Sequence, residues 1–182
     1  MGVGTDGSST IKEYGICYAV KENPTISDTK LKAGDKTDKP LDFSPGTGWN
    51  YSNSGYSLLG YIIEVVTKKS YEEAVRKYIF TPLHMTHSGF DFTHLKSPDK
   101  TTGYFMLDDK SSNPAPVVDS TVSFSAGAIY STTGDLYLWH KALEQNTVLS
   151  KAQQEESFTP VKNNYGYGWG IDSIEGKRRV GH

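Results

Sequence analysis

The feature that most constrains this chain is a run of apolar residues at helical spacing, placed directly after a turn rich in glycine and proline. The run comprises Leu58, Leu59, Ile62, Ile63 and Val66. Apolar side chains three and four positions apart share one face of a helix, so the sequence predicts a helix over residues 53–67 with that face buried. The turn at Pro45-Gly46 delivers Tyr51 and Asn53 to the start of this helix.

A capping box predicts a second helix. Ser70 and Glu73 have the spacing at which the serine hydroxyl accepts from the glutamate N–H and the glutamate side chain reaches back to the serine. Apolar residues continue on one face of this helix until Pro82 stops it.

Two further helices are expected in the second half of the chain. One begins near Thr132, with Thr132 and Asp135 as candidate caps. Its inner face is formed by Leu136, Trp139 and Leu143. Ser150 caps the other, shorter helix.

Strand composition occurs near both ends of the chain. Residues 11–20 have the composition of a strand, with Gly15 as a candidate bulge. Residues 165–171 and 178–182 are expected to form two strands around a turn at Glu175-Gly176.

The remaining long segments, 21–48 and 86–122, contain many turn-forming residues and are expected to be loops or irregular structure. A strand, a loop, several helices and then strands are typical of the α+β class, in which helices are segregated from an antiparallel sheet. We therefore expect an antiparallel sheet flanked by helices.

The composition excludes several classes of function. The 182 residues carry 19 Lys+Arg against 21 Asp+Glu, and the sequence contains no run of basic residues. A protein that binds nucleic acid through its charge is therefore not expected. No apolar stretch approaches the roughly 20 residues of a membrane span. Cys17 is the single cysteine and cannot form an internal disulfide. No cysteine or carboxylate completes a ligand set with His84, His87 and His94, so we expect neither a metal nor a cofactor.

Tyr51 and Asn53 are the candidate catalytic residues. A helix N-terminus offers N–H donors and the positive end of the helix dipole. There a phenol can act as a general base, and a carboxamide can hydrogen-bond a substrate carbonyl. In the alternative interpretation, Asn53 caps the helix and Tyr51 packs, and this segment taken alone favours that alternative.

Residues 39–67, KPLDFSPGTGWNYSNSGYSLLGYIIEVVT, resemble the Tyr-x-Asn region of the serine β-lactamase and penicillin-binding-protein superfamily, in its class C-like branch of β-lactamases, D,D-peptidases and esterases. Similar segments follow in the family's order at 79–89 (IFTPLHMTHSG), 125–136 (SAGAIYSTTGDL) and 165–170 (YGYGWG). Val180-Gly181-His182 matches the opening of its Gly-His motif. The resemblance therefore covers residues 39–182.

The resemblance implies acyl transfer, in which a serine of a Ser-x-x-Lys motif attacks a lactam, peptide or ester carbonyl. It implies that Tyr51 moves protons, that Asn53 holds the substrate amide, and that His182 helps place the anionic end of the substrate. Trp169 would line the cleft. It also implies a small-molecule or peptide acyl substrate and a location outside the cytoplasm, in the periplasm or at the cell exterior.

The chain departs from the family at the nucleophile. A Ser-x-x-Lys string starts at Ser9, in a Gly/Ser-rich segment that leads into a strand pattern. In a second alignment, residues 14–20 and 26–34 resemble the segment before the nucleophile, and Asp35 stands where the serine is expected. We therefore expect the nucleophile helix to be absent between Gly34 and Lys39, and the family's last strands to be absent after His182.

Three hypotheses remain open: a hydrolase, a truncated and inactive relative that acts as a binding or interaction module, and an incomplete stretch of a longer enzyme. We expect a flexible start over 1–10, a strand and loop of the α/β part over 11–38, a helical part carrying Tyr-Ser-Asn over 39–160, and a return to the sheet over 161–182. If the nucleophile helix is absent, the helices expected after it lose a packing partner for their apolar faces. We therefore predict that the chain forms a homo-oligomer or folds with a complementing fragment.

Overall fold

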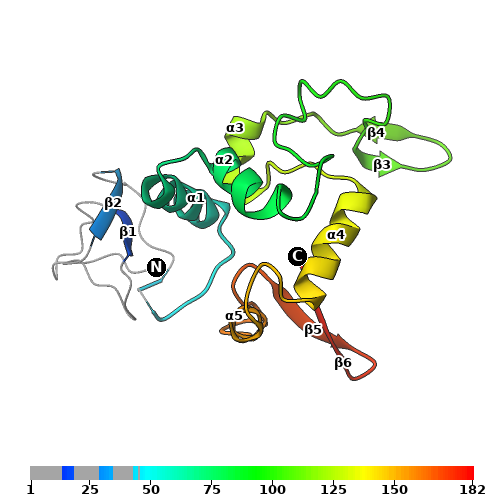
Figure 1. Cartoon of the computed structure of the whole chain (residues 1–182). Helices are drawn as coiled ribbons and strands as arrows, with labels where there is room; N and C mark the ends of the chain where they lie inside the picture. Colours follow the sequence, from blue (N-terminus) through cyan, green and yellow to red (C-terminus); the bar gives the residue numbers. More distant parts are fainter. Residues whose placement is uncertain (1–13, 19–28, 35–42, 45) are drawn as a thin grey trace. The chain divides into compact units, whose positions relative to one another are not determined.

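A computed structural model describes residues 14–18, 29–34, 43–44 and 46–182 (Figure 1). The chain forms two compact units, residues 1–62 and 63–182, and we describe each by itself. In the described residues the strands form three separate two-stranded antiparallel sheets, where the sequence predicted one sheet. Helices and antiparallel strands form separate blocks along the chain, as in the α+β class, but one strand pair lies between helices in the part predicted to be helical.

The first unit contains an antiparallel strand pair. Strand β1, Tyr14–Tyr18, pairs with β2, Thr29–Gly34, and the register shifts between Tyr14 and Gly15. The predicted strand and its bulge are therefore confirmed. The prediction of a loop over 21–48 was wrong at β2, because a strand is stabilised by hydrogen bonds to a partner, which local composition does not report. Ser9 and Asp35 lie outside the described residues.

Helix α1, Asn53–Thr67, has the predicted bounds. Its buried positions are Gly55 and Gly60, while Leu59, Ile63 and Val66 are 44%, 38% and 62% exposed. The prediction of a buried apolar face was therefore wrong for these three residues. Periodicity determines which side chains share a face of the helix, but it does not determine whether another element covers that face.

The second unit begins with the last turns of α1 and then α2, Tyr71–Val75. The predicted capping box at Ser70 is confirmed, since its hydroxyl accepts from the Glu73 N–H and the Glu73 carboxylate accepts from the Ser70 N–H at 2.8 Å. These backbone and side-chain hydrogen bonds from Ser70 lower the pKa of Glu73. A π-helical turn, η1, Arg76–Phe80, follows, and the helix stops before Pro82 as expected.

A small core lies between α2, η1 and the loop that follows them. Its buried side chains are Val75, Phe80, Met85 and Phe90. Tyr71 packs edge-on against Phe90 with ring centroids 5.6 Å apart, and burial raises the pKa of its phenol. Trp139 of the later helix α4 packs against this core, so the core joins α2 to a distant part of the chain.

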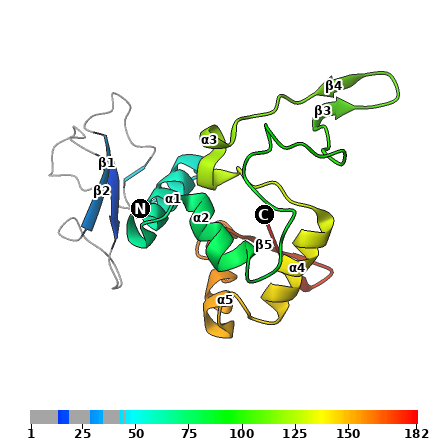
Figure 2. The same cartoon turned by 45° about the horizontal axis from the view of Figure 1, so that its top comes forward.

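A hairpin projects from the second unit (Figure 2). Strand β3, Tyr104–Leu107, pairs with β4, Ser112–Pro114, in a segment predicted to be irregular. Asp108 closes the turn, because its carboxylate accepts from the Lys110 and Ser111 N–H groups at 2.7 and 2.9 Å. Two short helical turns that the sequence did not predict follow: α3, Ser120–Ser123, and η2, Phe124–Ala126.

Helices α4, Thr133–Glu144, and α5, Lys151–Ser157, begin at the predicted caps. The Thr132 hydroxyl accepts from the Asp135 N–H, and Ser150 forms a capping box with Gln153. Leu136 is 53% exposed, so its predicted place on the inner face was wrong. The fully buried positions of α4 are Asp135 and Ala142, and the burial of a carboxylate could not be read from apolar spacing.

The second unit ends in a hairpin of β5, Gly170–Ile174, and β6, Lys177–Gly181. Glu175 and Gly176 both have positive φ, as a tight two-residue hairpin turn requires, which confirms the predicted turn. The first strand begins at Gly170 and not at residue 165, because residues 165–169 bend back toward α5.

Candidate active site

The turn before α1 takes its shape from two glycines. Gly46 has a φ of +79°, and the Thr47 N–H donates to the Ser44 carbonyl at 3.0 Å. At Gly48 a Cβ atom would meet the ring of Phe43 at 2.3 Å, so a side chain there would displace the phenylalanine. The turn therefore sets the approach of the chain to Tyr51 and α1.

Ser52 caps α1. Its hydroxyl accepts from the Gly55 N–H at 3.0 Å, and its carbonyl accepts from the Tyr56 N–H. Asn53 is consequently the first residue of the helix, and its exposed carboxamide does not provide the cap. Tyr51 is 46% exposed and directly precedes the cap. The alternative in which Asn53 caps the helix is therefore wrong, while the catalytic role of Tyr51 stays a prediction.

The N-terminus of α1 is electropositive. Its first turn contains no acidic residue that would offset the positive end of the helix dipole. Backbone N–H groups at this end point out of the helix. An anionic or carbonyl-bearing ligand beside Tyr51 and Asn53 would therefore meet a favourable field.

His182 and Trp169 belong to the second unit. His182 directly follows β6, and its ring lies edge-on to Tyr165 with centroids 6.0 Å apart. Trp169 packs edge-on against Phe158 at 5.2 Å. The structure thus brings Tyr51 and Asn53 together at one helix start, and it holds His182 and Trp169 on the segment that carries the β5–β6 hairpin.

The glycines of the segment 165–170 have distinct structural roles. A Cβ atom on Gly166 would lie 2.3 Å from the Ser157 carbonyl oxygen, so this glycine allows the chain to press against the end of α5. Gly168 has a φ of +83°. The Tyr167 N–H donates to the Ser157 carbonyl at 3.1 Å and completes the attachment. The repeated glycines therefore shape the turn that presents Trp169.

A pocket with a volume of about 390 Å³ lies beside this turn. Trp139 and Leu143 of α4, Glu156 at the end of α5, and Tyr167 and Trp169 of the turn contribute to its lining. Trp169 contributes to the lining of this pocket. Its predicted place in a substrate cleft with Tyr51 and Asn53 stays a prediction. The other aromatic and acidic lining residues were not predicted.

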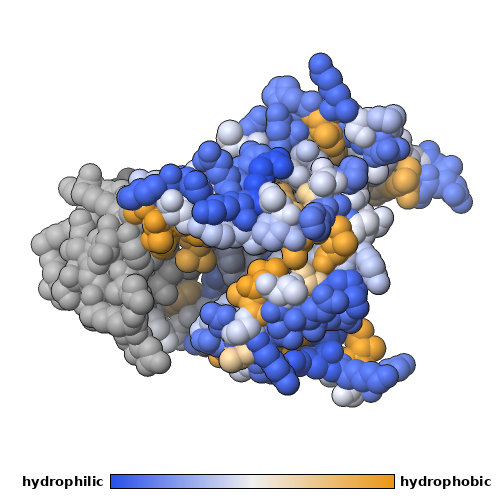
Figure 3. Space-filling view, viewed as in Figure 1, coloured by the Kyte–Doolittle hydropathy of each residue, from blue (hydrophilic) through white to orange (hydrophobic). Residues whose placement is uncertain are grey.

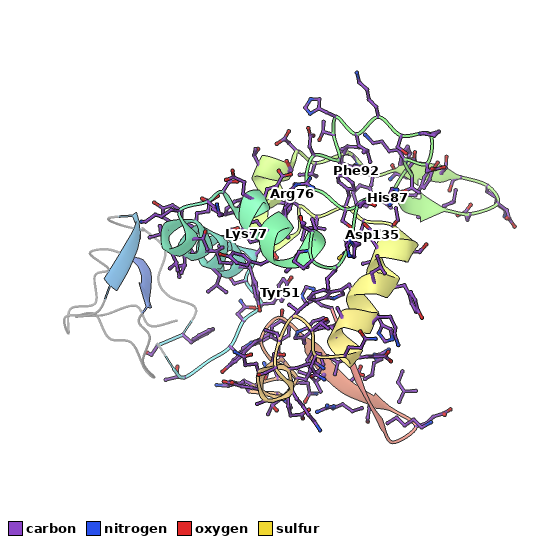
Figure 4. The ribbon with its side chains drawn as sticks, viewed as in Figure 1. Tyr51, Arg76, Lys77, His87, Phe92 and Asp135 are labelled. Carbon is purple, nitrogen blue, oxygen red and sulfur yellow. The ribbon has the colours of Figure 1, made fainter. Side chains whose placement is uncertain are left out.

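A buried polar cluster was also missed (Figure 4). The Asp135 carboxylate accepts from the Ser88 hydroxyl at 2.7 Å and from the His87 N–H at 2.8 Å. The hydroxyls of Ser88 and Ser131 lie 2.8 Å apart. The serine donates to the carboxylate and not to the His87 ring, so this cluster has the geometry of a structural clamp. Asp135 was recognised only as a cap, because its partners lie 47 and 48 residues away.

The other histidines lie in exposed positions. His94 pairs with Asp91 at 2.9 Å, and the His87 ring lies 3.7 Å from the Asp135 carboxylate. Over the residues that the structure describes, no three His, Cys, Asp or Glu side chains cluster in a way that could hold a metal ion. In the same part of the chain, no helix has the length and apolar character needed to cross a membrane.

Comparisons with known proteins agree over most of the chain. The Beta-lactamase family model matches residues 30–182. The putative penicillin-binding protein PbpX of Bacillus subtilis (strain 168) is 37% identical over 152 residues, which cover 83% of this chain and 37% of PbpX. The chain spans about a third of the length of the curated relatives it matches.

Solved structures match with similar extent. The octameric penicillin-binding protein homologue from Pyrococcus abyssi gives a TM-score of 0.67 at 34% identity, over 77% of this chain and 34% of that chain. The D-amino acid amidase from Ochrobactrum anthropi SV3, complexed with D-phenylalanine, gives a TM-score of 0.57 at 28% identity, over 79% of this chain and 46% of that chain.

Proposed function

Because the chain belongs to the Beta-lactamase family, in its class C-like branch, and has a β-lactamase/transpeptidase-like fold over the matched part, we propose that it serves acyl transfer of the serine hydrolase type on a lactam, peptide or ester carbonyl. The observation that carries the proposal is the start of α1. There Ser52 supplies the cap, so the Asn53 carboxamide remains available beside Tyr51.

Each site residue has a distinct role in this proposal. As a serine Oγ attacks the carbonyl carbon, Tyr51 takes up the serine proton and returns it to the leaving group. Asn53 donates a hydrogen bond to the substrate carbonyl. His182 helps to place the anionic end of the substrate, and Trp169 forms a wall. The proposal requires Tyr51, Asn53 and His182 to face one cleft.

The nucleophile is the point at which two functions separate. Asp35 stands where the second alignment expects the serine, and Ser9 begins a Ser-x-x-Lys string earlier in the chain. Without a serine nucleophile the chain has no covalent route, since Tyr51 and Asn53 cannot form an acyl-enzyme in its place. The Asp35 observation favours a second candidate function, in which the chain is a binding module that keeps the substrate contacts and has lost the chemistry.

The similar proteins favour an amide as the bond recognised. One solved structure is described as a D-amino acid amidase and another as a D-stereospecific amidohydrolase. We therefore propose an acyl substrate with a D-configured residue next to the reacting carbonyl, a description that also fits a cell-wall peptide. The proposal includes a location outside the cytoplasm.

The arrangement of the parts belongs to the same proposal. A helical part over 39–160 carries the Tyr-Ser-Asn segment; a strand and loop over 11–38 precede it, and strands over 161–182 follow it. The exposed apolar residues of α1 support assembly with a second copy or with a complementing fragment, because such side chains gain free energy when a partner covers them.

A fluorescent penicillin tests both functions on one sample. Intact-mass spectrometry detects a covalent adduct, and fluorescence anisotropy detects reversible binding. The acyl-transfer function predicts one adduct per chain, and Tyr51→Phe should slow its formation by about 10²–10⁴-fold because the proton acceptor is lost. Tyr61→Phe is the matched control, since Tyr61 is 47% exposed on the same helix.

The outcomes distinguish the candidates. An adduct that maps to Ser9 would show that the Ser9 string is the nucleophile and that Asp35 does not replace it. Saturable binding without an adduct, weakened by Asn53→Ala, would support the binding module. If the chain formed no adduct and also showed no saturable binding, both functions would be contradicted.

A further inference from the structure

The pocket of the second unit has the walls and the size of a small-molecule site. Its volume of about 390 Å³ lies within the roughly 300–1,000 Å³ of ligand pockets. Four aromatic side chains contribute to its lining: Trp139, Phe158, Tyr167 and Trp169. Figure 3 shows apolar residues reaching the surface in this part of the molecule, bordered by polar ones.

One carboxylate in the lining has no counter-charge. In the part of the chain that the structure describes, Glu156 takes part in no ion pair, and its carboxylate accepts a hydrogen bond from the Tyr167 hydroxyl at 3.4 Å. The adjacent Glu155 differs, because the Arg178 guanidinium binds it at 2.6 and 3.0 Å. This hydrogen bonding lowers the pKa of Glu155 and raises that of Arg178. Of two neighbouring acids, the one that lines the pocket is the one left unpaired with a cation.

The walls of the pocket are held in place before any ligand arrives. Gly166 packs against the Ser157 carbonyl, and the Tyr167 N–H donates to the same carbonyl at 3.1 Å. The Phe158 and Trp169 rings contact each other edge-on at 5.2 Å. Trp139 also packs against the core, which fixes the α4 side of the pocket. A preformed site spends little free energy on ordering its side chains when a ligand binds.

From this combination we propose that the pocket binds a small aromatic ammonium ion. The aromatic walls cover the ring of such a ligand and attract its cationic group through their π faces. The Glu156 carboxylate supplies the opposite charge. The proposal uses contacts within the second unit alone and does not depend on acyl transfer, although Trp169 takes part in both proposals.

Titration of the whole chain with phenethylammonium, monitored by intrinsic tryptophan fluorescence, tests the proposal. Two of the three tryptophans line the pocket, so binding should change the emission in a saturable way. We expect affinity for phenethylammonium about tenfold above that for neutral phenethyl alcohol, and higher still relative to phenylacetate. This ligand series is measured on the unaltered chain, so it remains informative even if a variant does not fold.

Glu156→Gln and Glu155→Gln form a matched pair of variants. The first should reduce the preference for the cation over the alcohol to less than about twofold, and the second should retain it. Equal affinity for the three ligands would overturn the proposal. The proposal would also be overturned if the preference for the cation over the alcohol survived Glu156→Gln, or if Glu155→Gln reduced that preference as much as Glu156→Gln does.

Discussion

The Asp135 clamp predicts a large and specific loss of stability. Asp135 is 3% exposed, and its carboxylate accepts from the Ser88 hydroxyl and the His87 N–H at 2.7 and 2.8 Å. The Asp135→Ala change removes both hydrogen bonds, leaving the His87 N–H without this acceptor and the Ser88 hydroxyl with the Ser131 hydroxyl as its remaining partner. A hydrogen bond to a charged group contributes about 1.5–3 kcal/mol, so we expect the free energy of unfolding to fall by about 3–5 kcal/mol.

Thermal and urea unfolding, followed by far-UV circular dichroism, measure this loss. The expected decrease corresponds to a fall in Tm of roughly 10–15 °C for a unit of this size. Both hydrogen bonds are accepted by Oδ2, so the carboxamide oxygen of Asp135→Asn can keep both without the charge, and this variant should lose about half as much. Asp91→Ala is the control, because Asp91 pairs with His94 at the surface and its loss should move the Tm by less than about 2 °C. A loss below about 1 kcal/mol in Asp135→Ala would refute the clamp.

Two further predictions concern glycine packing and acid stability. Gly166→Ala should destabilise the chain by about 2–4 kcal/mol, since its Cβ would meet the Ser157 carbonyl oxygen at 2.3 Å. Gly134→Ala on α4 should instead increase the free energy of unfolding by about 0.5–1 kcal/mol, because no atom would lie closer than 3.8 Å to its Cβ. Urea titrations of both variants check the signs, and a neutral Gly166→Ala would contradict the close approach. Because hydrogen bonds from Ser70 lower the folded-state pKa of Glu73, its stabilisation is present at neutral pH and is lost as the pH falls through that lowered pKa. Unfolding of Glu73→Gln from neutral to acid pH should show less loss of stability than the parent, and parallel curves would contradict the capping box.

The helix starts could be predicted from the sequence because their signals are local. In each of three caps the two interacting residues are three positions apart: Ser70 and Glu73, Thr132 and Asp135, and Ser150 and Gln153. The bulge at Gly15 and the turn at Glu175-Gly176 are local for the same reason, since glycine tolerates backbone conformations that other residues avoid. Such features require no knowledge of the rest of the fold.

Features that depend on a distant partner could not be predicted in this way. Strand β2 and the β3–β4 hairpin exist because another strand pairs with them, and turn-rich composition obscured both. The exposure of Leu136 and the burial of Asp135 depend on which face of α4 meets residues 86–90. Apolar spacing alone placed Leu136 inside and gave Asp135 only a capping role.

The candidate site shows the same division. The position of Tyr51 and Asn53 at a helix start followed from local spacing, while the capping role of Ser52 became clear only from its 3.0 Å hydrogen bond to the Gly55 N–H. The pocket around Trp169 combines α4, α5 and the turn before β5, so its shape depends on how three elements pack.

The most direct test of the proposed site is whether the α1 N-terminus and His182 face one cleft. A nitroxide label on Asn50→Cys, in a Cys17→Ser background, would report this through paramagnetic broadening of the His182 ring resonances. A shared cleft predicts strong broadening of the His182 signals that disappears when the nitroxide is reduced. Sharp His182 resonances, unchanged by the label, would contradict a shared cleft.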